Sequence, residues 1–490
     1  MADSCVVETS TMGEAAVVQA STEGNEEPKK CVAESDSNVD DSAIISSDMS
    51  GHSDIEADEK KGDAEDREGG HAENLTILLA FFLLVVDMVG NGVLSFPNSF
   101  ATLGWIPAHL INVLCAVLTI CAGLVLHRLR TKYVASATSY PQLFLGVFGK
   151  KGLVFARCNT YPLMFLLTSA FNYTQSSAWN SLFAGSSLSL QEWMVVAGAV
   201  SLLVLQARSF KAMALTSVVA ILTIIIPIFI SFVVIGNMVR NPDLYPIGNH
   251  VLFSEYKLSD CMVAAMDIVY AYSGIVMFLE IMSSMKYVER FKYSLVLSQS
   301  TCCVLYALVG SVVYGMAGDA SWLQSPYIDS LQPGTAKTVS MVCIIIHASI
   351  GILLSGNIFT YAAQRAIEPS FKRLIFGKKN APYKVAPLTV LKPAAMLWWL
   401  LWTSTTMSFV VLVNVAIPSF QTYLGFVSSI LASQTCFIWP GILDLKVFLK
   451  KREGKEHLLS AISVLLIVVG CIALPLGLWG DIKQIVALSR

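Results

Sequence analysis

The chain has 490 residues, of which 54% are hydrophobic and only 14% are charged, and its mean hydropathy is +0.62. Ordinary soluble domains carry about 25% charged residues, so this composition excludes a soluble multidomain protein. The formal net charge of −2 averages two different segments. Residues 1–74 hold 20 of the 35 acidic residues and 5 of the 33 basic ones, which leaves the other 416 residues strongly basic.

The first segment, residues 1–74, is rich in Ser, Glu, Asp and Gly and has no sustained apolar periodicity. Such a segment cannot bury enough apolar surface to offset the entropy lost on ordering. We therefore predict a disordered acidic tail on the cytoplasmic side. A solvated tail is the simpler interpretation, and a regulatory or sorting tail that binds cytoplasmic regulators is the alternative.

From Leu75 onward, apolar runs of the length that spans a bilayer, about 20 residues, follow one another. We predict an all-α polytopic membrane protein with a transporter domain at residues 75–480 and a short extracytoplasmic segment at 481–490. The eleven predicted spans lie at about 75–97, 105–126, 153–180, 189–207, 213–236, 260–282, 294–317, 336–361, 394–414, 418–440 and 457–479.

The distribution of basic residues tests this count independently, because cytoplasmic loops collect Lys and Arg. With the N-terminus in the cytoplasm, the inner loops hold 22 basic residues, whereas the outer loops hold only Arg240 and Lys257. One missed helix would invert the pattern beyond the error. The sequence therefore predicts eleven spans, with the N-terminus inside and the C-terminus outside.

Two spans contain weak points at mid-membrane. Span one has Gly90-Asn91-Gly92 and span six has Ser273-Gly274, and glycines propagate a helix poorly. Irregular backbone at that depth is tolerated where it lines an enclosed cavity. Spans one and six are corresponding members of two five-helix halves, and paired interruptions indicate the substrate site of an inverted-repeat transporter. Close packing through small residues is the alternative for each motif alone.

The chemistry of a broken helix favours a zwitterionic substrate. Freed amides after the first break carry partial positive charge and can hold a carboxylate, and freed carbonyls before the breaks can accept hydrogen bonds from an ammonium. This favours an amino acid over a sugar or a simple ion. The candidate substrate-binding residues at the breaks are Gly90, Asn91, Gly92, Val93, Leu94, Tyr272, Ser273 and Gly274.

Four ionisable residues lie at depth in the predicted spans: Asp87, Asp267, Glu280 and His347. A charge near the bilayer centre is costly, so such residues are functional candidates by default. Asp87 precedes the first break and is a candidate for carrying a proton, with a neutral core role as the alternative. Glu280 is a second coupling candidate, although a gating or structural role fits equally well. Asp267 is nearer the outer mouth, and for His347 a satisfied buried position is favoured.

Polar stripes on two further spans lie at helical spacing and either line the cavity or join helices. Asn172 on span three and Ser355 on span eight are the candidate substrate-binding residues among them. The stripes are Thr168, Asn172, Gln175 and Trp179 on span three and His347, Gly351 and Ser355 on span eight. The sequence has no HExxH, GxSxG or CxxC motif, so we predict no enzyme, cofactor, metal or nucleic-acid partner.

The residues of span one resemble a known family. The run GNGVLSFPNSFATLGW, which begins at Gly90, and YAYSG, which begins at Tyr270, are similar to the first-helix and sixth-helix signatures of the amino acid/auxin permease family. The sequence most resembles the fungal neutral amino acid permeases, which have an acidic residue at the position of Asp87 and a Ser-Gly pair like Ser355-Gly356.

The resemblance covers residues 75–480. It implies the five-plus-five inverted-repeat fold of the APC superfamily and proton-coupled symport of neutral amino acids by alternating access, with substrate at the unwound parts of helices one and six. Asn91 departs from relatives that often carry a smaller or apolar residue there. The alternatives are an amino acid sensor (transceptor) of the same fold and a vacuolar amino acid exporter. The plasma membrane is favoured over the vacuolar membrane.

Overall fold

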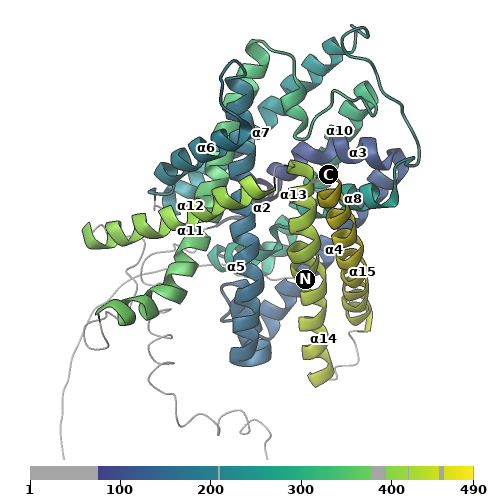
Figure 1. Cartoon of the computed structure of the whole chain (residues 1–490). Helices are drawn as coiled ribbons and strands as arrows, with labels where there is room; N and C mark the ends of the chain where they lie inside the picture. The colour runs from purple at the N-terminus through teal and green to yellow at the C-terminus, as the bar shows by residue number, and fades with distance from the viewer. Residues whose placement is uncertain (1–74, 208–209, 377–392, 418, 452–456, 489–490) are drawn as a thin grey trace, which may run out of the picture. The chain divides into compact units, whose positions relative to one another are not determined.

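The computed structural model describes residues 75–207, 210–376, 393–417, 419–451 and 457–488, so the predicted acidic tail lies outside the described residues. Within these ranges every element is helical apart from one isolated bridge between Leu75 and Met285. The elements, labelled as in Figure 1, are α2 (Ile77–Met88), η1 (Asn91–Ser95), α3 (Phe96–Leu103), α4 (Trp105–Lys132), α5 (Tyr140–Leu182), α6 (Leu190–Val204), α7 (Phe210–Met238), α8 (Leu258–Ala271), η2 (Gly274–Met277), α9 (Phe278–Ser284), η3 (Val288–Arg290), α10 (Phe291–Ala317), η4 (Tyr327–Ser330), α11 (Thr335–Phe376), α12 (Pro393–Ala416), α13 (Phe420–Val427), η5 (Ser428–Ala432), η6 (Gln434–Ile438), α14 (Trp439–Lys451) and α15 (His457–Leu488).

Eight helical stretches among the described residues are long and apolar enough to cross a membrane, and the bent pair α2 and α3 raises this to nine. Two of the eleven predicted spans fall outside this set. Helix α6 has only 15 residues, and the apolar run of α5 is interrupted by polar side chains along its second half. An all-helical membrane protein is confirmed, and the count of eleven stays a prediction.

The outer surface of the described helices is apolar. Leu203, Val304 and Leu397 are 74%, 69% and 70% exposed, and the most apolar stretch of α15 is only 22% buried. Soluble proteins rarely expose contiguous apolar surface of this kind, because water penalises it. These helices therefore face the lipid of a bilayer, in which leucine and valine side chains lose nothing by exposure.

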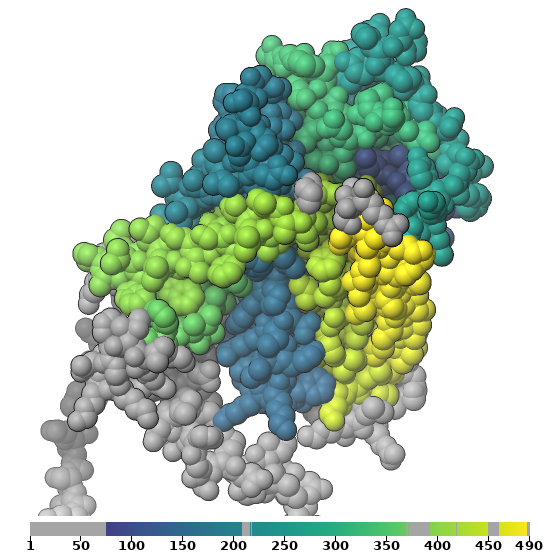
Figure 2. Space-filling view, viewed as in Figure 1, coloured from purple at the N-terminus to yellow at the C-terminus, as the bar shows by residue number. Residues whose placement is uncertain are grey.

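The broken helices lie at the centre of the packing. The most apolar part of the stretch from α8 to α9 is 83% buried, and α8 packs against η1, α3, α13 and α15. Helix α5 packs against α6, α11 and α12, and the C-terminal helices α14 and α15 lie side by side (Figure 1). In the space-filling view α12 crosses the outer face of α5 (Figure 2).

The stretch from α13 to α14 is not a regular α-helix. It contains two π-helical turns, η5 and η6, and η6 packs against η2. The hydroxyl of Ser428 donates to the carbonyl of Met266 over 2.7 Å, and the hydroxyl of Tyr140 donates to the carbonyl of Thr435 over 2.9 Å. Such π-helical insertions are rare and concentrate near functional sites. No sequence signal indicated this one.

The connection between α10 and α11 folds back onto the bundle. Its turn η4 packs against η1, α5 and α7. The Asp329 carboxylate accepts hydrogen bonds from the hydroxyls of Ser177 and Ser181, and Tyr327 is hydrogen-bonded to Ser231. Burial raises the pKa of Asp329, while the two serine hydroxyls oppose that shift. The connection is therefore held to α5 and α7 by specific contacts.

Candidate substrate site

Both predicted interruptions are present, and they have the same construction. Helix α2 ends at Met88, Val89 and Gly90 leave helical geometry (ψ of 71° and −127°), and the 3₁₀ turn η1 follows. Helix α8 ends at Ala271, and Tyr272 and Ser273 lead into the 3₁₀ turn η2. The first helix bends by 44° at its break. We call the two breaks, Val89–Asn91 and Tyr272–Ser273, and the residues that contact them the junction.

Two glycines allow the broken helices to approach each other closely. A Cβ atom built on Gly92 would lie 2.6 Å from Cβ of Ala271, and a Cβ atom on Gly274 would collide with the Asp87 carboxylate. Real Cβ atoms do not approach neighbours at these distances, so a side chain at either position would push the helices apart. The backbone neighbour makes glycine necessary at position 92, whereas a side chain at position 274 would displace the Asp87 carboxylate.

A tyrosine from a third helix connects the two breaks. The Tyr306 hydroxyl, on α10, lies 2.8 Å from the carbonyl oxygen of Met88 and 3.1 Å from that of Ala271. These carbonyls belong to the last residues of α2 and α8, beyond which the regular helical hydrogen bonds end. The Met88 carbonyl also accepts from the backbone N–H of Gly90 over 2.8 Å. Tyr306 is fully buried. Sequence reasoning missed it, because no local pattern marks a tyrosine that reaches two helix ends.

At the second break, Tyr272 is hydrogen-bonded to neighbouring helices. The Tyr272 hydroxyl donates to Oδ1 of Asn112 on α4 over 2.7 Å, and Nδ2 of Asn112 donates to the carbonyl of Cys303 over 3.0 Å. The Cys436 thiol lies 3.8 Å from the carbonyl of Tyr272. The polar groups of Tyr272 are therefore engaged by neighbouring helices.

At the first break, several buried polar atoms lack hydrogen-bond partners. Three buried atoms there have no hydrogen-bond partner of good geometry among the described residues: Oδ2 of Asp87, Nδ2 of Asn91 and Nε2 of His347. Oδ1 of Asn91 accepts from the Thr174 hydroxyl over 2.9 Å, and the Tyr270 hydroxyl lies near the same side chain. Leaving buried polar groups unpaired is costly, so such groups are uncommon in folded proteins.

The side chains of Val93 and Leu94 are 0% and 1% exposed and belong to the apolar core. Any contact of these two residues with a substrate is therefore made by the backbone. Ser273 is 4% exposed and begins η2 without a side-chain capping bond. These residues and the glycines lie at or beside the two breaks, and their contact with a substrate stays a prediction.

The two predicted site residues outside the breaks bond to other helices. Oδ1 of Asn172 accepts from Asn414 of α12 over 2.9 Å, and the Ser355 hydroxyl accepts from Thr168 of α5 over 2.9 Å. Gln175 likewise bonds to Ser349. No hydrogen bond joins Asn172 or Ser355 to the breaks among the described contacts, and Nδ2 of Asn172 is buried without a partner. The polar stripe of α5 joins helices, which was one of its two interpretations.

The two predicted coupling carboxyls belong to helices that pack together. Helix α2 packs against α9, and Asp87 is within electrostatic reach of Glu280. Both side chains are partly buried. Asp267, on α8, is fully buried, with Asp481 and Gln421 near it. Among the described residues no three His, Cys, Asp or Glu side chains are grouped so that they could hold a metal ion.

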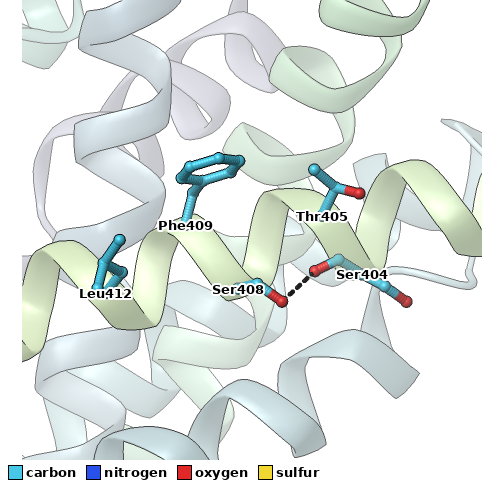
Figure 3. Close-up of a pocket in the computed structure, with 5 residues that line it drawn as sticks. All are labelled: Ser404, Thr405, Ser408, Phe409 and Leu412. Atoms are coloured by element: carbon cyan, nitrogen blue, oxygen red, sulfur yellow. Dashed lines mark hydrogen bonds between the residues drawn. The ribbon is translucent and has the colours of Figure 1, made fainter.

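Two surface hollows stand out among the described residues, and neither is lined by a residue of the two breaks. One, of about 320 Å³, is lined by five residues of α12 (Figure 3), of which Phe409 and Leu412 are 56% and 62% exposed. The other, of about 230 Å³, is lined almost entirely by apolar side chains of α4, α8, η6 and α15. A hollow on one lipid-facing helix surface offers no enclosed polar groups for a zwitterion.

The family model described as transmembrane amino acid transporter protein matches residues 73–483 of this chain. The chain belongs to the transmembrane amino acid transporter family. The resemblance indicated by the motifs of the first and sixth spans is thereby confirmed, and the match includes the whole junction.

Relatives of the chain are transporters by name. It is 23% identical to the N amino acid transport system protein of Neurospora crassa, over 82% of this chain and 83% of that protein. It is 21% identical to the amino acid transporter AVT6C of Arabidopsis thaliana, over 79% and 89%. Among solved structures it is similar to a nucleobase-cation-symport-1 family transporter, at 12% identity and a TM-score of 0.49 over 84% of this chain and 94% of that one. The names of the relatives support a role in transport and not in catalysis.

Proposed function

We propose that this protein is a secondary active transporter that carries neutral amino acids together with protons by alternating access. The observation that carries the proposal is the set of three buried, unpaired polar atoms at the first break. They include an amide donor, Nδ2 of Asn91, and two acceptors, Oδ2 of Asp87 and Nε2 of His347. A zwitterion needs both kinds of partner, because its carboxylate accepts hydrogen bonds and its ammonium donates them.

Proton coupling is supported by the carboxyl groups of Asp87 and Glu280. Two carboxylates within electrostatic reach of one another in a membrane repel when both are ionised, so a proton bound by the pair relieves the repulsion. Asp87 also packs against Gly274 of the second broken helix. Protonation of Asp87 would thus change the contact between the two broken helices.

The proposal includes the architecture predicted from the sequence. Eleven spans would form two inverted five-helix halves plus α15, and the shared order of α-helix, break, 3₁₀ turn and α-helix in the two broken stretches supports this symmetry. The N-terminus would be cytoplasmic, in the plasma membrane by preference, with an acidic tail at residues 1–74 and an extracytoplasmic segment at 481–490.

The test is uptake of radiolabelled amino acids into proteoliposomes, with and without an inward proton gradient. We expect uptake of neutral amino acids that the gradient stimulates. Asp87→Asn keeps the shape of the side chain and removes its charge, so it should abolish the stimulation by the gradient. Equal uptake without a gradient would contradict the coupling, and no uptake of any amino acid would contradict transport itself.

A further inference from the structure

Only one of the two ring nitrogens of His347 has a hydrogen-bond partner, and the other lies at the first break, where the ammonium group of a substrate would need an acceptor. Its Nδ1 lies 2.9 Å from the carbonyl oxygen of Ala220 on α7. A carbonyl oxygen only accepts, so this hydrogen bond assigns the ring proton to Nδ1. A neutral imidazole then carries a lone pair on Nε2, which can only accept.

Nε2 faces the first break. A Cβ atom built on Gly90 would lie 3.7 Å from Nε2 of His347 and 3.1 Å from the ring of Phe171. The imidazole is 3% exposed, and Nε2 has no hydrogen-bond partner among the described residues. Because Gly90 has no side chain, nothing of its own screens the nitrogen from the break.

The surroundings of the ring favour its neutral form. Val86 of α2, Ala220 of α7 and Ile350 of α11 form one apolar cluster beside it, and Phe171 of α5 lies across the ring at 6.2 Å. The ionisable group that α2 brings to the junction is Asp87, whose carboxylate packs against Gly274 on the other broken helix. A charged ring would repel an ammonium group, whereas the neutral ring attracts it.

We propose that Nε2 of His347 is the hydrogen-bond acceptor for the ammonium group of the substrate. This inference rests on the proposed transport of amino acids and makes it more specific. The ammonium would bind at Gly90 and His347, and the carboxylate would bind toward Asn91, whose Nδ2 is the unpaired donor one residue further along. His347 would thus make a free amino group a requirement for recognition.

Two substitutions test the acceptor nitrogen Nε2 separately from the hydrogen bond that Nδ1 makes to Ala220. In His347→Asn the side-chain amide can still donate to Ala220, and the acceptor at the break is lost. In His347→Gln the longer side chain can place its amide oxygen near the position of Nε2. We expect His347→Asn to raise KM by about ten- to a hundredfold with an unchanged maximal rate, since a hydrogen bond to a charged group is removed. His347→Gln should recover part of the loss.

The probes are L-alanine, L-leucine and L-phenylalanine, each paired with the acid that lacks the amino group: propionate, 4-methylpentanoate and 3-phenylpropionate. Wild-type protein in proteoliposomes should bind each amino acid more tightly than its paired acid, measured as competition against labelled substrate. In His347→Asn that preference should shrink by the same factor as the rise in KM, because the affinity for the acids does not change.

An unchanged KM in His347→Asn would overturn the proposal, as would an equal loss of affinity for the amino acids and the paired acids. A fall in maximal rate with loss of the proton gradient's effect, at unchanged KM, would assign His347 to proton transfer and also overturn it. If His347→Asn is not recovered as a monodisperse protein, the preference for the amino group is measured on His347→Gln alone. A raised KM of His347→Gln together with the full wild-type preference for the amino group contradicts the proposal. Failure of wild-type protein to transport any amino acid is a separate outcome that removes the proposed function.

Discussion

The two broken helices share one construction but differ in how their polar groups are bonded. At the second break, Tyr272 is held by Asn112 of α4 and approached by the thiol of Cys436. At the first break, Asp87, Asn91 and His347 each keep an unpaired polar atom. On the proposed function we infer a division of labour: Tyr272 anchors the second break to the surrounding helices, and the unpaired atoms at the first break bind the substrate.

The largest expected effect follows from adding one methyl group where the broken helices touch. In Gly92→Ala the new Cβ would lie 2.6 Å from Cβ and 2.7 Å from Cα of Ala271, so the backbone must shift. We expect loss of uptake and a destabilisation of about 1–3 kcal/mol, as for other overpacked cores. Gly185→Ala is the matched control, because nothing lies within 4 Å of its Cβ position. Normal uptake by Gly92→Ala would show that the contact is dispensable.

The next effect concerns the tyrosine that reaches both breaks. Tyr306→Phe would leave the carbonyls of Met88 and Ala271 without their shared donor. The expected cost is about 1–3 kcal/mol in thermal or denaturant unfolding, together with a slower maximal rate of uptake. Tyr423→Phe is the control, since its hydroxyl donates to a single carbonyl, that of Leu166 on α5, which belongs to neither broken helix. If both variants lose the same stability and the same rate, Tyr306 has no special role in the junction.

A crossed pair of substitutions tests the division of labour directly. Asn91→Ala removes an unpaired donor, and the Thr174 hydroxyl keeps a second acceptor in the carbonyl of Ala170 at 3.1 Å. We expect KM to rise about tenfold with a stability loss below about 1 kcal/mol. Asn112→Ala should do the opposite: it leaves the Tyr272 hydroxyl unpaired, so stability falls by about 1–3 kcal/mol while KM is retained. The reverse outcome would place ligand binding at the second break.

The smallest effect is expected at the hollow on α12. The hydroxyl of Ser408 bonds only to the carbonyl of Ser404 in its own helix among the described contacts (Figure 3). Ser408→Ala should therefore leave uptake and KM unchanged and shift stability by less than about 0.5 kcal/mol. A raised KM in this variant would move the substrate site from the junction to the surface of α12.

The sequence predicted the breaks because their causes are local. Two glycines around Asn91, and the Ser273-Gly274 pair, weaken helix propagation wherever they occur, and α2 and α8 end within three residues of them. Asn172 and Ser355 were assigned to the correct helices, but periodicity alone does not say which neighbour a helix face meets. Asn172 meets Asn414, 242 residues further along the chain.

The remaining features depend on contacts between distant segments. For His347 the sequence favoured a satisfied buried side chain, and the structure satisfies only one of its two nitrogens, through the carbonyl of Ala220 at a separation of 127 residues. Tyr306 is 218 residues from Met88 in sequence. No local pattern contains this information.

The Tyr306 hydroxyl carries a single hydrogen and faces two carbonyl oxygens, at 2.8 Å and 3.1 Å. It cannot form a full hydrogen bond with both at once, so each helix end receives a share. When one broken helix moves away, the hydrogen turns wholly to the other, and the loss is smaller than that of a complete bond. The shared hydrogen therefore holds the ends of α2 and α8 together, and it lowers the free energy needed to separate these two helix ends.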